Sequence, residues 1–94
     1  MENSPENNAE VLALQVLTFV LSKKTLRDRF IALSGLSVEE ISERVSDKEF
    51  LGGVLDFLLF NENDVLWFCK EHEVDPQQPK IARDFFLGNS MREK

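Results

Sequence analysis

The feature that most constrains the fold is an apolar hexapeptide that the sequence contains twice in nearly the same form. Residues 16–21 read VLTFVL and residues 54–59 read VLDFLL, so the two copies lie 38 positions apart. Neither copy shows the strict alternation of apolar and polar residues that marks a half-buried strand. Tyr, Thr and Ile, which favour strands, are scarce in the chain. We therefore expect an all-α protein in which the two helices that carry these segments lie at the centre.

The resemblance between the two parts of the chain extends beyond the hexapeptide at the same offset of 38. It predicts an internal repeat in which residues 11–45 and 49–85 each form three helices, as two pseudo-symmetric halves that pack on each other. The alternative is a chance match between two apolar runs. The identical pairs are Val16 and Val54, Leu17 and Leu55, Phe19 and Phe57, Leu21 and Leu59, and Phe30 and Phe68.

Short polar residues mark the starts of five helices. At such a position the side chain accepts a hydrogen bond from a backbone N–H of the first helical turn. Two of the serines, Ser37 and Ser46, are followed three residues later by a glutamate, which predicts a capping box. The expected caps are Ser4, Ser22, Ser37, Ser46 and Asn61.

The predicted helices form a single compact domain, because 94 residues supply one ordinary core. Gly35 is placed to end the second helix in the left-handed conformation. The sixth helix is expected to start late, after a tight turn, because Pro79 lacks a backbone N–H. The ends of the chain, residues 1–4 and 89–94, are expected to fray. The six helices are predicted at residues 5–21, 24–34, 38–45, 47–60, 62–73 and 80–87.

The charge balance restricts the classes of partner. With 17 acidic and 11 basic residues, the chain has a formal net charge of −6, which repels nucleic acid and anionic membranes. The turn SGLS and its flanking helices resemble a helix-turn-helix motif, but Glu39, Glu40 and Glu43 would then face phosphate groups. We expect neither nucleic acid nor a membrane to be a partner.

The sequence also points to a compartment. The longest apolar stretches, residues 11–21 and 50–60, are shorter than the ~20 residues that span a bilayer. The first residues, MENSPENNAE, lack the basic and apolar regions of a secretory signal. The single cysteine, Cys69, cannot form an internal disulfide. We therefore expect a cytoplasmic protein.

Residues with reactive or metal-binding side chains are few. Cys69 and His72 are three positions apart and can share a helical face, but two ligands do not complete a metal site. Asp56 is the only charged residue in the run FLGGVLDFLLF and has no evident partner in the sequence. At the offset of 38 it corresponds to Thr18, which is typical of a narrow polar stripe on a mostly buried helix. We expect no metal, no cofactor and no catalytic residue.

A basic group stands out against the acidic remainder of the chain. Between residues 39 and 75 there are 11 acids and three bases. The basic group is either a docking surface for an acidic partner or a solvated corner that attracts acidic residues of the same or a neighbouring molecule. It consists of Lys23, Lys24, Arg27 and Arg29.

The apolar residues predict association with another chain. Residues 50–60 are apolar in nearly every direction around the expected helix, so this helix must be covered on all sides. Gly52 and Gly53 allow close approach of the first helix or of another chain. The adjacent rings of Phe85 and Phe86 point about 100° apart on a helix, so we expect one in the core and one outside it. A homodimer or other apolar association is the expected result.

Four segments in this order resemble a family of small alphaproteobacterial proteins classed as a domain of unknown function. The segments are ALQVLTFV, RFIALSGLS, FLGGVLDFLL and VDPQQP. The resemblance covers about residues 9–87 and implies an all-helical bacterial cytoplasmic protein. It assigns no activity or site residue.

Two functional hypotheses follow. The first is a small interaction module or adaptor that binds a protein partner or itself. The alternative is a small-ligand binder or minor enzyme with a pocket between the two halves near Asp56. An apolar surface favours the first hypothesis, and a pocket lined by Asp56 and other polar groups favours the second.

Overall fold

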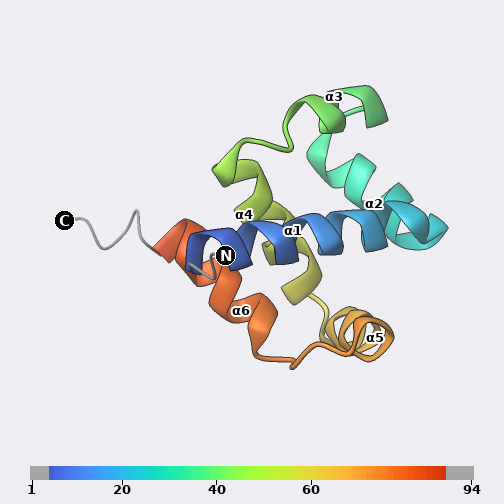
Figure 1. Ribbon diagram of the computed structural model, residues 1–94. Helices are drawn as coiled ribbons and strands as arrows, with labels where there is room; N and C mark the ends of the chain where they lie inside the picture. The colour runs from blue at the N-terminus through green and yellow to red at the C-terminus, as the bar shows by residue number, and fades with distance from the viewer. Residues whose placement is uncertain (1–4, 89–94) are drawn as a thin grey trace.

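A computed structural model describes residues 5–88 of the chain (Figure 1). These residues form six α-helices followed by a π-helical turn, and no strand occurs among them, which confirms the all-α prediction. The predicted fraying of residues 1–4 and 89–94 lies outside the described residues, as does the predicted cap Ser4. The helices are α1 (Pro5–Ser22), α2 (Lys24–Ser34), α3 (Val38–Glu43), α4 (Lys48–Leu59), α5 (Glu62–His72) and α6 (Gln78–Arg83), and the π-helical turn is η1 (Asp84–Gly88).

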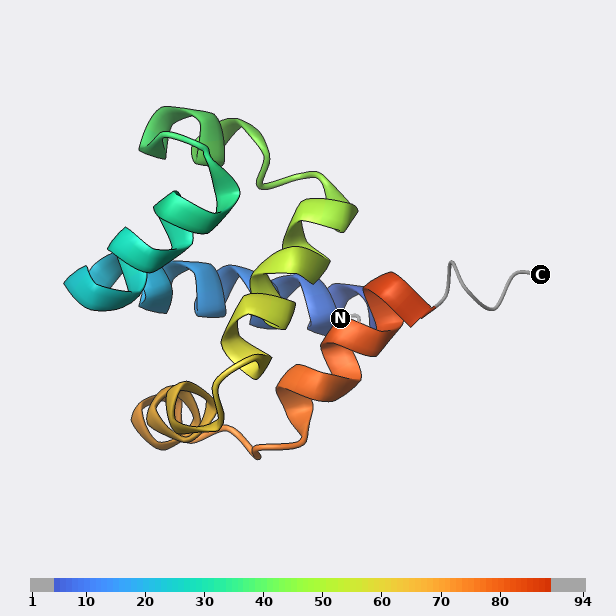
Figure 2. The same ribbon diagram turned by 180° about the vertical axis from the view of Figure 1, so that it is seen from behind.

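The two helices that carry the repeated hexapeptide, α1 and α4, cross at the centre of the molecule (Figures 1 and 2). Helix α2 packs on α1, helix α5 packs on α4, and α6 packs on both central helices. The burial of large apolar side chains in this arrangement is the main favourable contribution to folding. Residues of the central helices that are fully buried include Val16, Val20, Val54, Leu55 and Leu58.

The offset of 38 that relates the two halves of the sequence also relates their backbones. Adding 38 to the residue numbers of α2 (24–34) gives the residue numbers of α5 (62–72). The residue after each of these helices is left-handed, with φ of 73° at Gly35 and 55° at Glu73. The second helix of each half therefore begins and ends at corresponding residues, whereas α1 begins earlier than α4 does at this offset.

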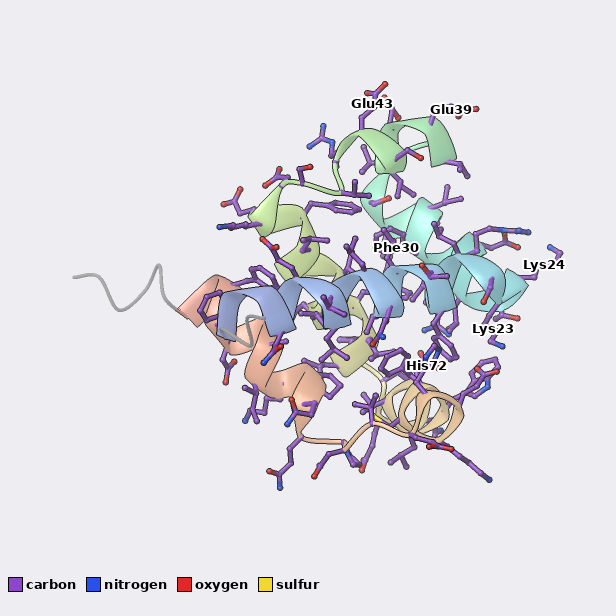
Figure 3. The ribbon with its side chains drawn as sticks, viewed as in Figure 1. Lys23, Lys24, Phe30, Glu39, Glu43 and His72 are labelled. Carbon is purple, nitrogen blue, oxygen red and sulfur yellow. The ribbon has the colours of Figure 1, made fainter. Side chains whose placement is uncertain are left out.

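The third helices of the two halves differ in their packing. Helix α6 lies against α1 and α4 and continues into η1, which also contacts both. Helix α3 lies at the periphery, next to the end of α2 (Figures 1 and 2). Its buried residue is Ile41, while Glu39 and Glu43 are exposed and project outward (Figure 3). The third helix of the first half therefore adds one residue to the core, whereas the third helix of the second half packs against both central helices.

Two of the predicted helix starts are confirmed in detail. The backbone N–H of Glu40 donates to Ser37 Oγ at 3.1 Å and the backbone N–H of Ser37 donates to Glu40 Oε1 at 2.9 Å, which completes the capping box of α3. Asn61 Oδ1 accepts from the backbone N–H of Asn63 at 3.0 Å and caps α5.

Two other predicted caps are wrong. Ser22 is the last residue of α1, so its hydroxyl donates back to the Phe19 carbonyl at 2.8 Å instead of capping α2. Asp47, and not Ser46, caps α4, because its carboxylate accepts from the backbone N–H of Glu49 at 3.0 Å. A carboxylate also interacts favourably with the positive end of the helix dipole.

The bounds of the last two helices differ from the prediction as well. Helix α5 ends at His72, because Glu73 is left-handed. Helix α6 begins at Gln78, two residues before the predicted start, with Pro79 in its first turn. A proline is tolerated there, because the first N–H groups of a helix have no partner within the helix. The regular helix ends at Arg83, and the predicted continuation to Leu87 is a π-helical turn.

Candidate functional site

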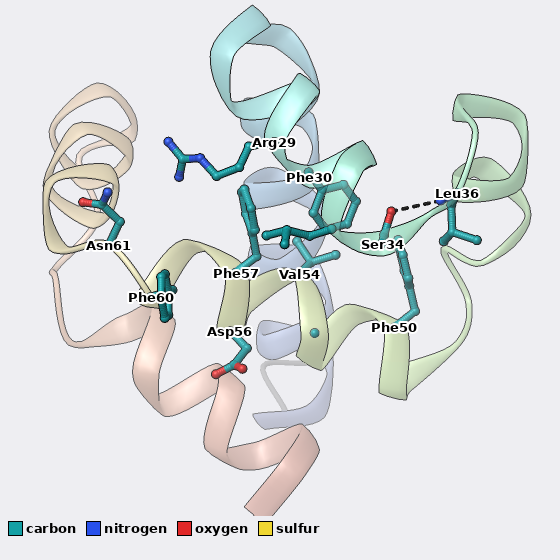
Figure 4. Close-up of a pocket in the computed structure, with 12 residues that line it drawn as sticks. Arg29, Phe30, Ser34, Leu36, Phe50, Val54, Asp56, Phe57, Phe60 and Asn61 are labelled. Atoms are coloured by element: carbon teal, nitrogen blue, oxygen red, sulfur yellow. Dashed lines mark hydrogen bonds between the residues drawn. The ribbon is translucent and has the colours of Figure 1, made fainter.

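A groove of about 680 Å³ lies between α2 and α4. Helix α2 forms one wall and α4 forms the floor and the other wall (Figure 4). Most of its lining is apolar, and the polar residues that reach it are Arg29, Ser34, Asp56 and Asn61. The principal apolar residues are Phe30, Leu33, Phe50, Val54, Phe57 and Phe60.

Three phenylalanine rings hold the two walls in place. The buried ring of Phe30 on α2 lies edge to face with Phe57 on α4, at 5.1 Å between ring centres, and with Phe50 at 6.1 Å. Phe50 and Phe57 are half-buried, so one side of each ring remains accessible from the groove. Leu33 and Phe60 on the rim are 71% and 89% exposed. The groove is thus a firm apolar surface that is open to solvent.

Gly53 lies in the groove near the middle of α4. It is exposed, and no atom of the fold lies within 4 Å of the position that a Cβ would occupy. A glycine in a helix interior costs about 1 kcal/mol relative to alanine. The packing of this chain therefore leaves room for a side chain at this position.

The two charged residues of the groove are both paired within the chain. Arg29 donates to the buried carboxylate of Asp64 at 3.0 Å and lies over the ring of Phe57 at 5.6 Å. Asp56 points from α4 toward α6 (Figure 4), where it accepts from Arg83 at 2.8 Å. These pairs orient both charges toward neighbouring helices, so the groove offers mainly apolar contacts.

The corresponding space between α5 and α1, at the offset of 38, is filled by aromatic side chains. The buried ring of Phe19 on α1 lies edge to face with Trp67 and with Phe68 on α5, each at 5.3 Å. His72 stacks on Phe68 with 4.6 Å between the ring centres, and Figure 3 shows His72 on α5. Phe19 and Phe68 are buried and Trp67 and His72 lie over them at the surface, so four rings contact one another where the other half has a groove. We refer to Phe19, Trp67, Phe68 and His72 as the aromatic cluster.

A lysine closes the aromatic cluster from the solvent side. The Lys23 ammonium lies 5.2 Å from the ring centre of Phe19 and 5.3 Å from that of Trp67, and it donates to Glu71 at 3.1 Å. A smaller hollow of about 370 Å³ remains beyond the cluster, beside Leu12 and Val74. The hollows in the two equivalent spaces therefore differ in both volume and polarity.

The predicted basic group is bound by acidic residues of its own chain. In addition to the pairs of Lys23 and Arg29, Lys24 binds Asp28 at 3.0 Å and Arg27 lies 3.7 Å from the same carboxylate. The hydrogen bond from Lys24, aided by the charges of Lys24 and Arg27, lowers the pKa of Asp28. Of the four cations, Arg29 lines the groove.

The predicted pair of adjacent phenylalanines lies on η1, away from the groove. Phe86 is buried in the core, and Phe85 is half-buried at its edge. Their rings lie edge to face at 5.7 Å. The two residues complete the core beside α1 and α4.

Cys69 and His72, the residues considered for metal binding, have separate surroundings. Burial, with a smaller effect from the charge of Asp75, raises the pKa of the Cys69 thiol. His72 is exposed at the end of α5. Within residues 5–88, no group of three or more His, Cys, Asp or Glu side chains is placed to hold a metal ion.

The sequence pointed to two of the residues that line the groove, Asp56 beside a pocket between the two halves and Arg29 in the basic group. The apolar lining was not predicted. The sequence does contain a signal, because Phe50, Gly53 and Phe57 follow one face of α4 and Leu51 and Leu55 follow the other. This signal shows that α4 has two apolar faces. Which face is open depends on where α2 lies.

The comparisons with known proteins give a family but no activity. The family described as protein of unknown function (DUF3572) matches residues 6–89. The chain belongs to this family. The predicted resemblance to a family of unknown function is thereby confirmed. No curated protein and no solved structure matches the chain. In the described part of this DUF3572 chain, no helix has the length and apolar character to cross a membrane.

Proposed function

We propose that this DUF3572 protein is an interaction module that binds the apolar face of a protein helix in the groove between α2 and α4. One observation carries the proposal: the space between α5 and α1 is filled by four rings, whereas the equivalent space between α2 and α4 is open and apolar. An open apolar surface of this kind marks an interaction site in soluble proteins.

The length of the groove supports a helix as the occupant. The lining follows α4 from Phe50 to Phe60, which is about 15 Å at the rise of an α-helix. A partner helix that lies in such a groove inserts side chains at every third or fourth position. The exposed side chains of Leu33 and Phe60 extend the apolar surface beyond the hollow.

The charged groups support binding rather than catalysis. A general acid or base must be free to exchange a proton with a substrate, and the Asp56 carboxylate is held by Arg83 at 2.8 Å. The alternative occupant is an apolar small molecule, which the volume of about 680 Å³ would admit.

The proposed partner is a protein, not a nucleic acid or a membrane, and the proposed compartment is the cytoplasm. The net charge of −6 supports the exclusion of polyanions. The exposed residues Glu39 and Glu43 on α3 add negative charge near the end of α2. The single cysteine, Cys69, is a free thiol, as is usual in a reducing compartment.

Site-specific photo-crosslinking in living cells tests the proposal. A photoreactive phenylalanine analogue replaces Leu33 on the groove rim, and a matched control carries it at Ile81 on α6, which is 56% exposed. We expect protein adducts from position 33 only, and we expect Gly53→Leu, which fills the groove, to abolish them. Adducts that persist in Gly53→Leu, or that form equally from position 81, would contradict the proposal.

A small molecule retained by the purified protein in native mass spectrometry, and displaced by Gly53→Leu, would favour the alternative.

A further inference from the structure

The negative charge of the chain is concentrated in the elements that form one side of the groove. Residues 38–62 comprise α3, α4 and the start of α5, and they contain seven acidic and two basic residues. The bases are Arg44 and Lys48, and the acids are Glu39, Glu40, Glu43, Asp47, Glu49, Asp56 and Glu62. This local excess of five negative charges accounts for most of the net charge of −6. An apolar groove with acidic surroundings is complementary to a surface that is apolar and basic.

One edge of the groove places carboxylates directly beside apolar contacts. Four exposed residues lie at positions i, i+4, i+7 and i+11 of α4 and its C-terminal cap, and therefore share one stripe: Glu49, Gly53, Asp56 and Phe60. All of them except Glu49 line the groove. Glu49 precedes Phe50, the first residue of α4 in the lining. A helix in the groove therefore runs past two carboxylates on α4 as well as past the ring of Phe60.

The cations beside this edge do not offset its acids. Arg29 is bound to the buried carboxylate of Asp64 at 3.0 Å, so this pair is neutral. Arg83 is shared by two carboxylates, because its Nη1 donates to Asp56 at 2.8 Å and its Nε donates to Asp84 at 2.9 Å. One guanidinium thus balances two acids, and the Asp56 side chain remains 58% exposed. A negative charge is left over at the edge of α4, where a partner would lie.

The end of the groove near α3 is acidic as well. Leu36, which lies just before α3, lines this end together with Phe50 (Figure 4). Glu39 and Glu43 on α3 are exposed and project outward (Figure 3). The buried residue of α3 is Ile41, so this short helix contributes mainly negative charge to the surroundings of the groove.

We infer that the partner in the groove is a basic amphipathic helix, whose apolar side chains enter the groove and whose lysines or arginines face the carboxylates of α3 and α4. This inference rests on the proposed function and specifies the chemistry of the partner. Lysine and arginine suit such a position, because their apolar stems lie along aromatic surface while their charged ends stay in water. The acidic surroundings attract this helix and repel an acidic one. The carboxylates are exposed, so added salt should weaken the attraction.

Two synthetic peptides test the inference. Each has about 18 residues, which is long enough for a marginally stable helix, and both carry the same leucines at positions i, i+3, i+4 and i+7. Lysines flank these leucines in one peptide, and glutamates flank them in the other. Fluorescence anisotropy of the labelled peptides measures their binding to the purified full chain. We expect the lysine peptide to bind at least about tenfold more tightly, with a difference that shrinks in about 1 M salt.

A charge reversal with a matched control locates the contact. Glu49→Lys acts on the edge of α4, whereas Glu10→Lys makes the same change in net charge on α1, outside the lining. We expect Glu49→Lys to weaken binding of the lysine peptide by about three- to tenfold and Glu10→Lys to leave it within about twofold. Circular dichroism should show that both variants keep their helices, because neither side chain belongs to the core. Equal weakening by the two variants would overturn the inference.

Gly53→Leu separates this inference from the proposed function. Filling the groove should abolish binding of the lysine peptide. If the two peptides bind equally well and Gly53→Leu blocks both, the groove is the site and the inference about charge is wrong. Absence of binding by the lysine peptide would also overturn the inference, and adducts from position 33 in cells would then still support the proposed function. Binding of the lysine peptide that Gly53→Leu leaves unchanged would contradict both.

Discussion

The space between α1 and α5 and the space between α2 and α4 occupy equivalent places in the two halves, yet one is filled and the other is open. In the filled space Trp67, Phe68 and His72 pack around Phe19. In the open space Phe30 and Phe57 keep the same contact that Phe68 and Phe19 make. The framework is therefore shared, and the side chains that surround it decide whether a groove remains.

Two exchanges account for most of this difference. Trp67 corresponds to Arg29, whose guanidinium is bound to Asp64 at 3.0 Å. His72 corresponds to Ser34, whose hydroxyl accepts from the backbone N–H of Leu36 at 3.2 Å. Each exchange removes an aromatic ring from the open space. A small number of side-chain differences between the two halves therefore separates a filled space from an open groove.

The largest expected effect compares the two phenylalanines that correspond at the offset of 38. Phe19→Ala removes a buried ring from the aromatic cluster and should lower the free energy of unfolding by about 3–5 kcal/mol. Phe57→Ala removes a half-buried ring from the groove wall and should cost about 1–2 kcal/mol, because part of this ring already contacts water. Urea unfolding followed by circular dichroism measures both. Equal losses would mean that the groove is as much a part of the core as the cluster.

The next effect compares two carboxylates that pair with arginines near the groove. Asp64→Ala should cost about 1–3 kcal/mol, because it leaves a cavity and removes the partner of Arg29 at a buried position. Asp56→Ala should cost less than about 0.5 kcal/mol, because the pair with Arg83 is exposed. Chemical unfolding of both variants gives the comparison. A loss at Asp56 as large as that at Asp64 would contradict the assignment of Asp56 to a solvated ion pair.

A smaller effect compares the left-handed residues that end α2 and α5. Gly35→Ala should destabilise the protein by about 1 kcal/mol, because an L side chain is strained at this φ of 73°. Glu73→Gly should stabilise it by about 0.5–1 kcal/mol, because glycine relieves the same strain at a φ of 55°. Thermal unfolding should show melting temperatures that move in opposite directions. Shifts of the same sign would show that the two ends are not equivalent.

The smallest effect concerns the thiol of the second half. Cys69 corresponds to Ile31, and burial raises the pKa of the Cys69 thiol. The unfolded chain then releases the thiol proton at a lower pH than the folded chain. The free energy of unfolding therefore falls as the pH rises past the ordinary pKa of a thiol. Unfolding curves above neutral pH should show this decline for the natural protein and a weaker one for Cys69→Ile, which cannot titrate. Identical pH profiles would count against a buried, neutral thiol.

Helix caps and the identity of the two central helices could be predicted from the sequence. Ser37 and Asn61 cap their helices as predicted, because the capping residue and its backbone partner lie within three residues of each other. The apolar hexapeptides identified α1 and α4 as the central helices for a similar reason, since an apolar segment must be buried wherever it lies. The prediction for Ser22 is wrong because α1 extends through this residue. The prediction for Ser46 is wrong because the next residue, Asp47, caps α4.

The groove between α2 and α4 could not be predicted from the sequence in the same way. Phe30 and Phe57 are separated by 27 positions, and their contact depends on how α2 is placed beside α4. The sequence predicts that residues 50–60 are apolar in nearly every direction and must be covered on all sides, whereas the described chain leaves Phe60 89% exposed and Phe50 and Phe57 half-buried. It did not indicate that α3 lies at the periphery and contributes only Ile41 to the core. The position of α3 depends on distant contacts and not on its own composition.

The phenylalanine rings provide the most direct test of the claim that the open groove, and not the filled space, is the binding surface of this protein. Aromatic carbon signals of the full chain can be followed by NMR while the dye 8-anilinonaphthalene-1-sulfonate, which binds exposed apolar surface, is added. We expect signals of Phe50, Phe57 and Phe60 in the groove to shift as the dye is added, whereas those of Phe19 and Phe68 in the aromatic cluster stay in place. Constant groove signals, or shifts confined to the aromatic cluster, would contradict it.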